Sequence, residues 1–277
     1  MTVFRPGRLD EALGFLAEAP AVLLAGGTDV FPALGDRPAP GRVLDLTAIA
    51  EMRGIAREGD HWRIGAGVTW AELCRADLPP QFDALKRAGR QVGSVQIQTT
   101  ATIAGNICNA SPAADGVPVL MALDAELDLA SAAGRRVVPL AGFVTGNRRT
   151  LLRPDEVVTA IRVPHLDGAV RSDFAKLGSR AYLVISIVSM AAVLRCEDGR
   201  VADARIAVGA CSAVPLRLAA LERELVGRGA GTLGAAVRAE HFAALTPIDD
   251  VRASAAYRRD AVCTMAVRML HGWGTEG

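Results

Sequence analysis

The sequence is poor in aromatic residues and has almost no net charge. Phe, Trp and Tyr make up 4% of its 277 residues, and 31 Lys and Arg balance 30 Asp and Glu to a formal charge of +1. A basic surface interleaved with aromatic rings is therefore not expected, which argues against nucleic acid as a partner. Hydrophobic residues make up 51% and charged residues 22%, a composition typical of a folded globular protein.

The sequence also lacks any apolar run long enough to cross a membrane. The longest run, around Leu183–Leu194, is about ten residues long, whereas a transmembrane helix needs about 20. The segment Met1–Pro6 lacks the apolar stretch of a secretory signal. We therefore expect a cytoplasmic protein with no membrane span.

Cysteine and histidine are too scattered to predict a metal centre. The five cysteines form no C-x-x-C pair, and the four histidines form no H-x-x-x-H pair. An odd number of widely spaced cysteines favours reduced thiols, and it argues against zinc or an iron–sulfur cluster held by this chain alone. No serine lies in a G-x-S-x-G motif, and no acid–base pair stands out. The sequence thus predicts no metal ligand and no catalytic side chain of its own.

Hydrophobic periodicity divides the chain into three parts, at residues 1–53, 54–167 and 168–277. In the first two parts, helical and strand-like segments alternate. The apolar residues Leu9, Ala12, Leu13 and Leu16 predict a helix over 9–16, and Thr69 and Glu72 have the spacing of a capping box.

The third part has strand-like runs at 174–177, 185–195 and 201–209, and the turn residues Glu197-Asp198-Gly199-Arg200 predict a hairpin between the last two runs. The expected helices follow at 216–226, 231–245 and 252–270. Strands followed by helices predict the α+β class.

One motif, Leu24-Ala25-Gly26-Gly27-Thr28-Asp29, follows a short apolar run. Two glycines allow the backbone to approach a ligand closely and to turn its amides toward an anion. The motif lacks the G-x-G-x-x-G spacing of a Rossmann fold. An ordinary tight turn is the alternative interpretation of such a Gly-Gly pair.

A second motif, Thr102–Asp115, lies within the turn-former-rich stretch Gly93–Asp115, which predicts a long irregular loop. Ser111-Pro112 predicts a helix N-cap followed by proline at the first helical position. Asn106 offers both hydrogen-bond donors and acceptors, and a long ordered loop is typically functional. A surface loop without function is the alternative.

Together the two motifs resemble the FAD-binding subunit of the xanthine dehydrogenase and carbon monoxide dehydrogenase family of molybdenum hydroxylases. The first is similar to that family's A-G-G-[TH]-[DS] turn, and the second to its T-[IL]-G-G-N-x-x-x-[AG]-[ST]-P-x-[AS]-D loop. Two further segments, Gly146–Glu156 and Phe174–Arg180, resemble G-x-R-x-T-x-L-x-x-x-E and F-x-K-x-x-x-R. The resemblance covers essentially the whole chain in the family's order.

The sequence departs from the family pattern at two positions. Ala104 stands where the family usually has the first glycine of its second loop, and Val184 stands where many members carry Asp. The methyl group of Ala104 is expected to tighten the approach of a pyrophosphate, while Gly105 and Asn106 keep the pattern.

The resemblance implies an α+β fold, with a two-part FAD-binding domain like that of the vanillyl-alcohol oxidases followed by a smaller α+β domain of antiparallel sheet and helices. It implies FAD as cofactor, with the molybdenum cofactor and [2Fe–2S] clusters on partner subunits only. Electrons would pass from those clusters through FAD to NAD⁺, a quinone or O₂. The expected assembly is a dimer of heterotrimers with a molybdenum-cofactor large subunit and a [2Fe–2S] small subunit.

The resemblance also implies which residues bind FAD. They are Leu24, Ala25, Gly26, Gly27, Thr28, Asp29, Val30, Thr102, Ile103, Ala104, Gly105, Asn106, Asn109, Ala114, Asp115, Val158, Lys176 and Tyr182. Lys176 would place a cation near the flavin, and a surface ion pair is its alternative role. Tyr182 would pack near the ring, and packing in the protein core is its alternative role.

Two other functions stay open at this stage. The chain could be a stand-alone FAD-binding protein or oxidase that has lost its molybdenum and iron–sulfur partners. It could also belong to the wider FAD family of small-molecule oxidases and a cell-wall reductase. Members of that wider family usually carry substrate-site bases or nucleophiles of their own, which this sequence lacks.

Overall fold

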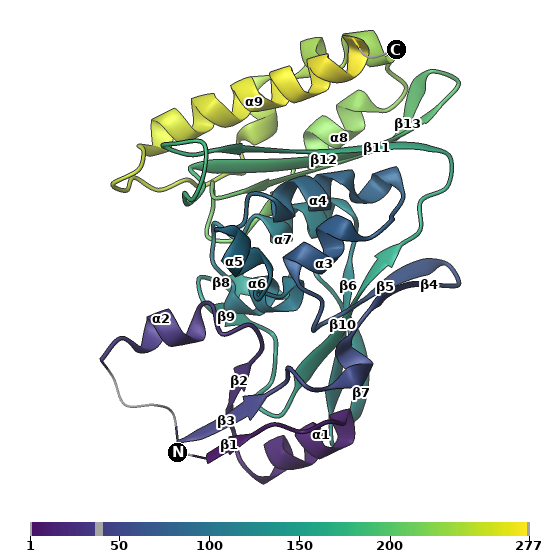
Figure 1. Cartoon of the computed structure of the whole chain (residues 1–277). Helices are drawn as coiled ribbons and strands as arrows, with labels where there is room; N and C mark the ends of the chain where they lie inside the picture. The colour runs from purple at the N-terminus through teal and green to yellow at the C-terminus, as the bar shows by residue number, and fades with distance from the viewer. Residues whose placement is uncertain (1, 37–40, 276–277) are drawn as a thin grey trace. The chain divides into compact units, whose positions relative to one another are not determined.

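The computed structural model describes residues 2–36 and 41–275, which form two compact units. Unit 1 comprises Met1–Ala76, Gly93–Ala110 and Asp124–His165, and unit 2 comprises Asp77–Val92, Ser111–Leu123 and Leu166–Gly277. The chain therefore passes between the units several times before its last segment stays in unit 2 (Figure 1). The division of the chain at residues 53 and 167 remains a prediction.

Unit 1 contains a small parallel sheet of order β1-β3-β2, in which the chain crosses over through a helix. Its elements are β1 (Thr2–Phe4), α1 (Leu9–Glu18), β2 (Val22–Leu24), α2 (Val30–Leu34) and β3 (Arg42–Asp45). The predicted helix over 9–16 is confirmed because Leu9, Ala12 and Leu16 lie on its buried face. The strand β2 ends directly before the Gly-Gly motif.

The larger sheet of unit 1 has five antiparallel strands in the order β4-β5-β10-β6-β7. These are β4 (Ile55–Glu58), β5 (His61–Gly65), β6 (Glu126–Ser131), β7 (Gly134–Pro139) and β10 (Val157–Pro164). The remaining elements of the unit are η1 (Ala50–Met52), α3 (Trp70–Arg75), α5 (Val95–Gln98), α6 (Ile103–Asn109), β8 (Val144–Gly146) and β9 (Arg149–Thr150). The predicted capping box at α3 is confirmed, since Thr69 Oγ1 accepts from the Glu72 amide and Glu72 accepts from the Thr69 amide.

The predicted long loop over Gly93–Asp115 is wrong, because the structure forms two short helices within it. Ser94 caps α5 by accepting from the Ile97 amide, and Thr102 caps α6 by accepting from the Gly105 amide at 2.9 Å. Such caps satisfy amide groups that a helix of weak formers would otherwise leave without acceptors.

The prediction that Ser111-Pro112 begins a helix is also wrong. Helix α7 starts only at Gly116, and Ser111 instead accepts the Ala113 amide in a tight turn. The Pro112 carbonyl, which a helix would use internally, accepts from the amide of Ala210 at 3.0 Å. A tertiary contact has therefore displaced the local capping signal.

Unit 2 is built on a four-stranded antiparallel sheet of order β11-β12-β13-β14. Its strands are β11 (Ala169–Leu177), β12 (Val188–Glu197), β13 (Arg200–Gly209) and β14 (Leu216–Arg217). Asp198 and Gly199 both have positive φ, 49° and 73°, and form the tight hairpin that the sequence predicted between β12 and β13.

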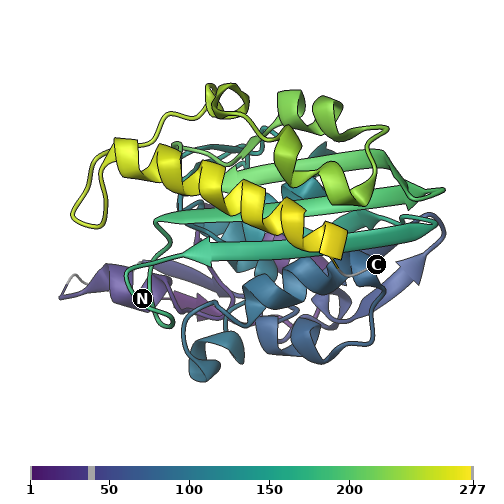
Figure 2. The ribbon, with the colours of Figure 1, turned by 90° about the horizontal axis from the view of Figure 1, so that it is seen from above.

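Helices cover both faces of this sheet. On one face lie η2 (Pro80–Phe82), α4 (Asp83–Gly89) and α7 (Gly116–Ala122), and on the other lie α8 (Ala219–Leu225) and α9 (Ala255–Thr275) (Figure 1). Figure 2 shows α9 lying across the strands. Strands followed by helices confirm the predicted α+β class.

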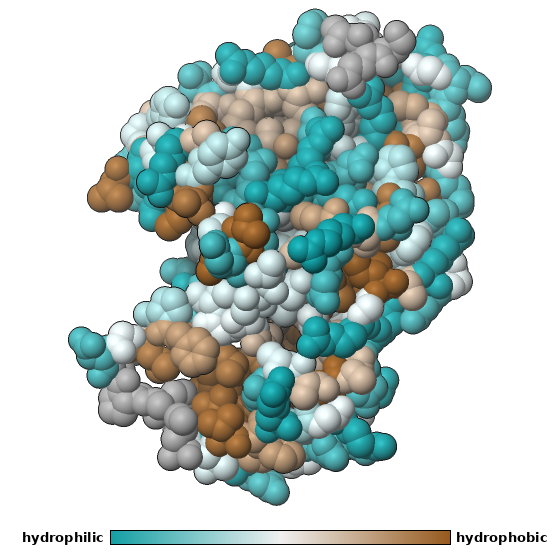
Figure 3. All heavy atoms as spheres, in the orientation of Figure 1, coloured by the Kyte–Doolittle hydropathy of each residue, from teal (hydrophilic) through white to brown (hydrophobic). Residues whose placement is uncertain are grey.

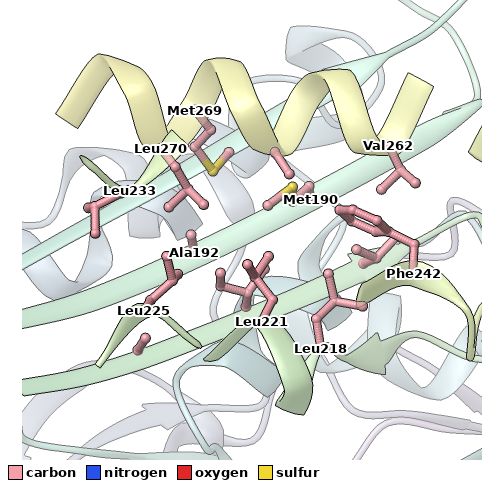
Figure 4. Close-up of a cluster of buried hydrophobic side chains, with 14 of the residues drawn as sticks. Met190, Ala192, Leu218, Leu221, Leu225, Leu233, Phe242, Val262, Met269 and Leu270 are labelled. Atoms are coloured by element: carbon pink, nitrogen blue, oxygen red, sulfur yellow. The ribbon is translucent and has the colours of Figure 1, made fainter. Parts of the chain in front are cut away.

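The core of unit 2 fills the space between the sheet and α8 and α9 (Figure 4). Met190 of β12 packs there with Leu221 of α8 and with Val262 and Leu270 of α9, and all four are fully buried. Burial of side chains of this size typically contributes about 1.5–3 kcal/mol each.

The predicted helix over 231–245 is wrong. The segment forms three 3₁₀ turns, η3 (Ala230–Thr232), η4 (Gly234–Ala236) and η5 (Ala239–Phe242). Gly231 and Gly234 weaken an α-helix by about 1 kcal/mol each. A Cβ atom at Gly234 would also lie 3.1 Å from the Val267 carbonyl oxygen, so this turn packs closely on α9.

Candidate functional site

In unit 1, the backbone of the first motif packs against the segment that leads into the second motif. A Cβ atom at Gly26 would lie 2.1 Å from the carbonyl oxygen of Thr100, far inside van der Waals contact. Thr100 lies two residues before Thr102, the N-cap of α6. The absent side chain of Gly26 thus allows the turn after β2 to pack against the segment that leads into α6.

Gly27 serves the same turn in another way. Its φ of +69° lies in the left-handed region, where a side chain is strained. The Gly27 carbonyl accepts from the amide of Phe31 at 3.1 Å, which starts α2. Leu24 is joined to the neighbouring strand because its carbonyl accepts from the Leu46 amide at 2.8 Å. The predicted segment Leu24–Val30 is therefore a fixed turn between a strand and a helix.

Asn106 has an unmatched polar atom in the first turn of α6. Its amide donates to the Thr102 carbonyl at 3.0 Å, but its buried Oδ1 has no hydrogen-bond partner among the described residues. A buried acceptor without a donor is unfavourable, and in native proteins it typically marks a ligand or water site. A ligand that carries hydroxyl groups, such as the ribityl or ribose part of FAD, supplies the missing donor. The residues of this turn therefore fit the cofactor that the sequence implies.

Asp29 connects the first motif to two later segments. Its Oδ1 accepts from Asn109 Nδ2 at 2.9 Å and lies 3.8 Å from Arg148 Nη1. Arg148 also donates its backbone amide to the Ala110 carbonyl at 2.9 Å. Three of the four segments that resemble the flavoprotein family thus meet in unit 1.

The fourth segment lies in unit 2, where Lys176 forms a buried ion pair with Asp115. Lys176 Nζ donates to Asp115 Oδ2 at 2.6 Å, and Ser186 Oγ donates to Asp115 Oδ1 at 2.6 Å. Asp115, Lys176 and Ser186 are all buried. Burial raises the pKa of Asp115, and the Lys176 charge and the Ser186 hydrogen bond oppose that rise. Lys176 does form an ion pair, but inside the unit and not on its surface.

The remaining predicted residues are placed in different surroundings. Ala104 and Ala114 are buried, and Val158 is buried in β10 beside a break in the strand register. Tyr182 is 77% exposed, so the alternative of core packing is wrong. Unit 1 holds Leu24–Val30, Thr102–Asn106, Asn109 and Val158, whereas Ala114, Asp115, Lys176 and Tyr182 belong to unit 2.

Two residues that the sequence analysis did not name as site residues contact the predicted ones. Arg148 contacts Asp29, and Ser186 contacts Asp115. Arg148 lies in a segment that the resemblance included, so its signal was available, whereas Ser186 carried no signal in the sequence. A cleft of about 270 Å³ in unit 2, between α4, β11 and α9, is lined by none of the predicted residues.

Within residues 2–36 and 41–275 no group of three or more His, Cys, Asp or Glu side chains is arranged to hold a metal ion. No helix in these ranges has the length and hydropathy to span a bilayer.

The turn fixed by Gly26 and the unmatched Asn106 acceptor, both in unit 1, fit a bound flavin dinucleotide. Residues 1–166 match the family of the FAD binding domain in molybdopterin dehydrogenase, and residues 174–272 match the CO dehydrogenase flavoprotein C-terminal domain. The chain belongs to this family, and it is an FAD-binding subunit of the molybdenum hydroxylases, as the sequence predicted.

Individual relatives are similar over most of their length. The chain is 34% identical to the xanthine dehydrogenase FAD-binding subunit of Escherichia coli O157:H7, over 77% of this chain and 75% of the relative. It is 30% identical to the carbon monoxide dehydrogenase medium chain of Hydrogenophaga pseudoflava, over 96% and 94%. A chain of reconstituted CO dehydrogenase from Oligotropha carboxidovorans superposes with a TM-score of 0.91 at 26% identity, over 100% and 98%. The predicted two-part FAD-binding fold is thereby confirmed.

Proposed function

We propose that this chain is the electron-output subunit of a molybdenum hydroxylase complex. It receives electrons from the [2Fe–2S] clusters of a partner subunit and delivers them through FAD to NAD⁺, a quinone or O₂. The observation that carries the proposal is the turn of unit 1, where Gly26 packs on Thr100 and Asn106 presents an unmatched buried acceptor. When bound, FAD supplies the redox chemistry, so the protein need supply only position and electrostatics.

Each predicted segment has a role in this proposal. The turns Leu24–Val30 and Thr102–Asn106 hold the pyrophosphate and ribityl groups, with Asn106 Oδ1 accepting from a hydroxyl. Asn109, Ala114 and Asp115 contact ribityl or flavin polar atoms, and Val158 contributes a backbone contact. Lys176, whose charge is balanced by Asp115, would supply a cation toward the flavin.

The partners follow from the family. The similar chain from Hydrogenophaga pseudoflava is a medium chain, which supports a place among larger and smaller subunits. We propose a dimer of heterotrimers in the cytoplasm, with one molybdenum-cofactor large subunit and one [2Fe–2S] small subunit beside each copy of this chain.

The cofactor is tested first. The purified chain, reconstituted with FAD or FMN at equal concentration, is desalted, and the flavin released by heat is resolved by chromatography. We expect FAD in preference to FMN, because two separate turns provide more contacts than one terminal phosphate requires. Retention of FMN alone, or of no flavin, would refute the proposal.

The electron-output role is tested by comparing the lone chain with the complex. The chain is expressed alone and together with its neighbouring genes, and both preparations are assayed for hydroxylation of heterocycles and aldehydes. We expect hydroxylation only in the complex, while the lone FAD-loaded chain reduces an artificial acceptor after chemical reduction. Absence of molybdenum and [2Fe–2S] partners in affinity purifications from the native host would favour a stand-alone flavoprotein instead.

A further inference from the structure

Helix α2 follows directly on the Gly26-Gly27 turn of unit 1, and none of its side chains is buried. In Figure 1 it projects from the rest of unit 1, and Figure 3 shows hydrophobic side chains at the same place. A helix of five residues is marginal by itself and normally depends on packing against other groups. Contact with a ligand would therefore have a large effect on the order of α2.

Phe31 is the exposed aromatic residue of this helix. Its side chain is 62% exposed, whereas the other phenylalanines of the chain are all buried or half-buried. An aromatic ring presents a wide apolar face and has only two rotatable side-chain bonds, so it loses little entropy when a planar group covers it. Phe31 thus offers a flat apolar surface on unit 1.

The ring of Phe31 adjoins the turn that the proposed function assigns to the pyrophosphate. A Cβ atom at Gly27 would lie 2.5 Å from Phe31 Cε2 and 2.8 Å from Phe31 Cδ2, so one edge of the ring rests on the Gly27 backbone. The Phe31 amide donates to the Gly27 carbonyl and the Ala33 amide to the Asp29 carbonyl, each at 3.1 Å. The turn and the ring are therefore held together by the same short segment.

FAD extends from its pyrophosphate in two directions, and the proposed function assigns residues to only one of them. The ribityl and flavin groups are assigned to residues of α6 and beyond, including Asn106 and Asn109. Phe31 lies on a different element, α2, which begins at the turn itself. The adenosine half is the part of the cofactor without an assigned residue, and adenine is a planar base of the kind that stacks on aromatic side chains.

We propose that Phe31 binds the adenine ring of FAD and thereby makes the chain select the dinucleotide over FMN, which lacks that ring. The inference rests on the proposed function and names a specificity-determining residue for its cofactor. Contacts between a base and an aromatic side chain typically contribute a factor of about 5 to 150 to affinity, as judged by alanine substitution. Because α2 buries no side chain of its own, the contact also orders this helix.

The first test measures the affinity of the full chain for FAD and for ADP, which carries the adenosine diphosphate part of FAD without the flavin. FAD is titrated by its fluorescence, and ADP by its displacement of FAD. The variants are Phe31→Ala, Phe31→Trp and the control Val137→Ala, which shortens a 45% exposed apolar side chain on β7 of the same unit.

We expect Phe31→Ala to weaken FAD and ADP by the same factor, about 5 to 150. Phe31→Trp keeps an aromatic face and should bind both ligands about as tightly as the wild type, as should Val137→Ala. Loss of the helix does not explain weaker binding by Phe31→Ala, because alanine favours a helix more than phenylalanine does.

A second measurement follows the order of α2 without any flavin. Amide hydrogen exchange at Phe31 and Ala33 should slow several-fold when ADP is added to the cofactor-free wild type. The same addition, at a concentration that saturates the variant, should slow the α2 amides of Phe31→Ala much less. The amides of β10 should keep their protection in both proteins, which separates local order from global stability.

Each other outcome contradicts the inference in a different way. If Phe31→Ala weakens FAD but not ADP, the ring contacts the flavin half. If it weakens neither, Phe31 does not contact the cofactor, and if Phe31→Trp is as weak as Phe31→Ala, the ring has a structural role. If the wild type binds FAD but ADP does not displace it, the inference is wrong while FAD binding stands. If the wild type binds no FAD, the proposed function fails and this inference fails with it.

Discussion

Lys176 Nζ lies 2.6 Å from Asp115 Oδ2, and both side chains are buried inside unit 2. Removal of either charge from such a pair leaves the other buried without compensation, which typically costs about 3–5 kcal/mol. The pair therefore couples the stability of unit 2 to the protonation of one carboxylate.

Lys176→Met should lower the free energy of unfolding by about 3–5 kcal/mol near neutral pH. Burial already raises the pKa of Asp115, and loss of the lysine charge removes the main opposing influence. A carboxyl group whose folded-state pKa is raised stabilises the fold more as the pH falls, because the folded form then binds the proton more tightly. Denaturant unfolding should thus show that the free energy of unfolding of Lys176→Met falls less far below that of the wild type at about pH 5 than at about pH 8.

The double variant Asp115→Asn with Lys176→Met is the control. It removes both charges, so most of the lost stability should return and the pH dependence of the deficit should disappear. An equal deficit for the single variant at both pH values would show that Asp115 is not the group that responds.

Gly26→Ala should reduce FAD retention and lower the free energy of unfolding by about 1–3 kcal/mol. The added Cβ would lie 2.1 Å from the Thr100 carbonyl oxygen, so the two turns of unit 1 must move apart. The space that a side chain at Gly26 would fill is occupied by protein backbone and not by the ligand.

Gly14→Ala provides the matched control for this substitution. Gly14 lies in α1, and a Cβ there would meet nothing within 4 Å. Alanine should stabilise the helix by up to about 1 kcal/mol and leave flavin content unchanged. Thermal unfolding and flavin absorbance measure both effects, and full flavin content in Gly26→Ala would contradict the role of this contact.

Asn106→Ala should weaken FAD binding by about 1–3 kcal/mol, roughly 5- to 150-fold. Its Oδ1 has no partner among the described residues, so its loss should change the stability of the cofactor-free chain little. FAD titration followed by fluorescence measures the first effect and thermal unfolding without FAD the second. Gln96→Ala, on the exposed side of α5, should change neither. Equal loss of stability with and without FAD would assign Asn106 a purely structural role.

Asp250→Asn should cost about 1.5–3 kcal/mol of stability at neutral pH. Burial alone would raise the pKa of Asp250. Hydrogen bonds outweigh that effect and lower the pKa to about 2, and they come from the amides of Arg252 and Ala253 and from the side chains of Arg252 and Arg258. A lowered folded-state pKa stabilises the fold above the usual value of 3.8 and loses that contribution as the pH falls toward about 2.

Denaturant unfolding of Asp250→Asn and wild type should therefore converge as the pH is lowered below about 4. Asp260→Asn, at an exposed position of α9, serves as control and should stay close to the wild type throughout. A constant difference between Asp250→Asn and wild type across this range would show that the ionised carboxylate is not the stabilising group.

The sequence by itself determined the α+β class, the capping box at Thr69 and the hairpin at Asp198-Gly199, because these depend on local periodicity and turn chemistry. Its spaced motifs also identified the FAD-binding family. Local signals failed where a residue distant in the sequence took the same hydrogen-bonding group. Pro112 does not begin a helix, because its carbonyl accepts a hydrogen bond from the amide of Ala210.

Only the tertiary structure decided what the candidate residues contact. Gly26 meets Thr100, Asp29 meets Asn109, and Lys176 meets Asp115, and each pair joins segments about 60 to 80 residues apart. Sequence spacing carries no information on such contacts, since they depend on how strands and helices pack. The burial of each side chain also depends on the tertiary structure. Lys176 forms its ion pair in the interior of unit 2, whereas Tyr182 is exposed in the connection between β11 and β12.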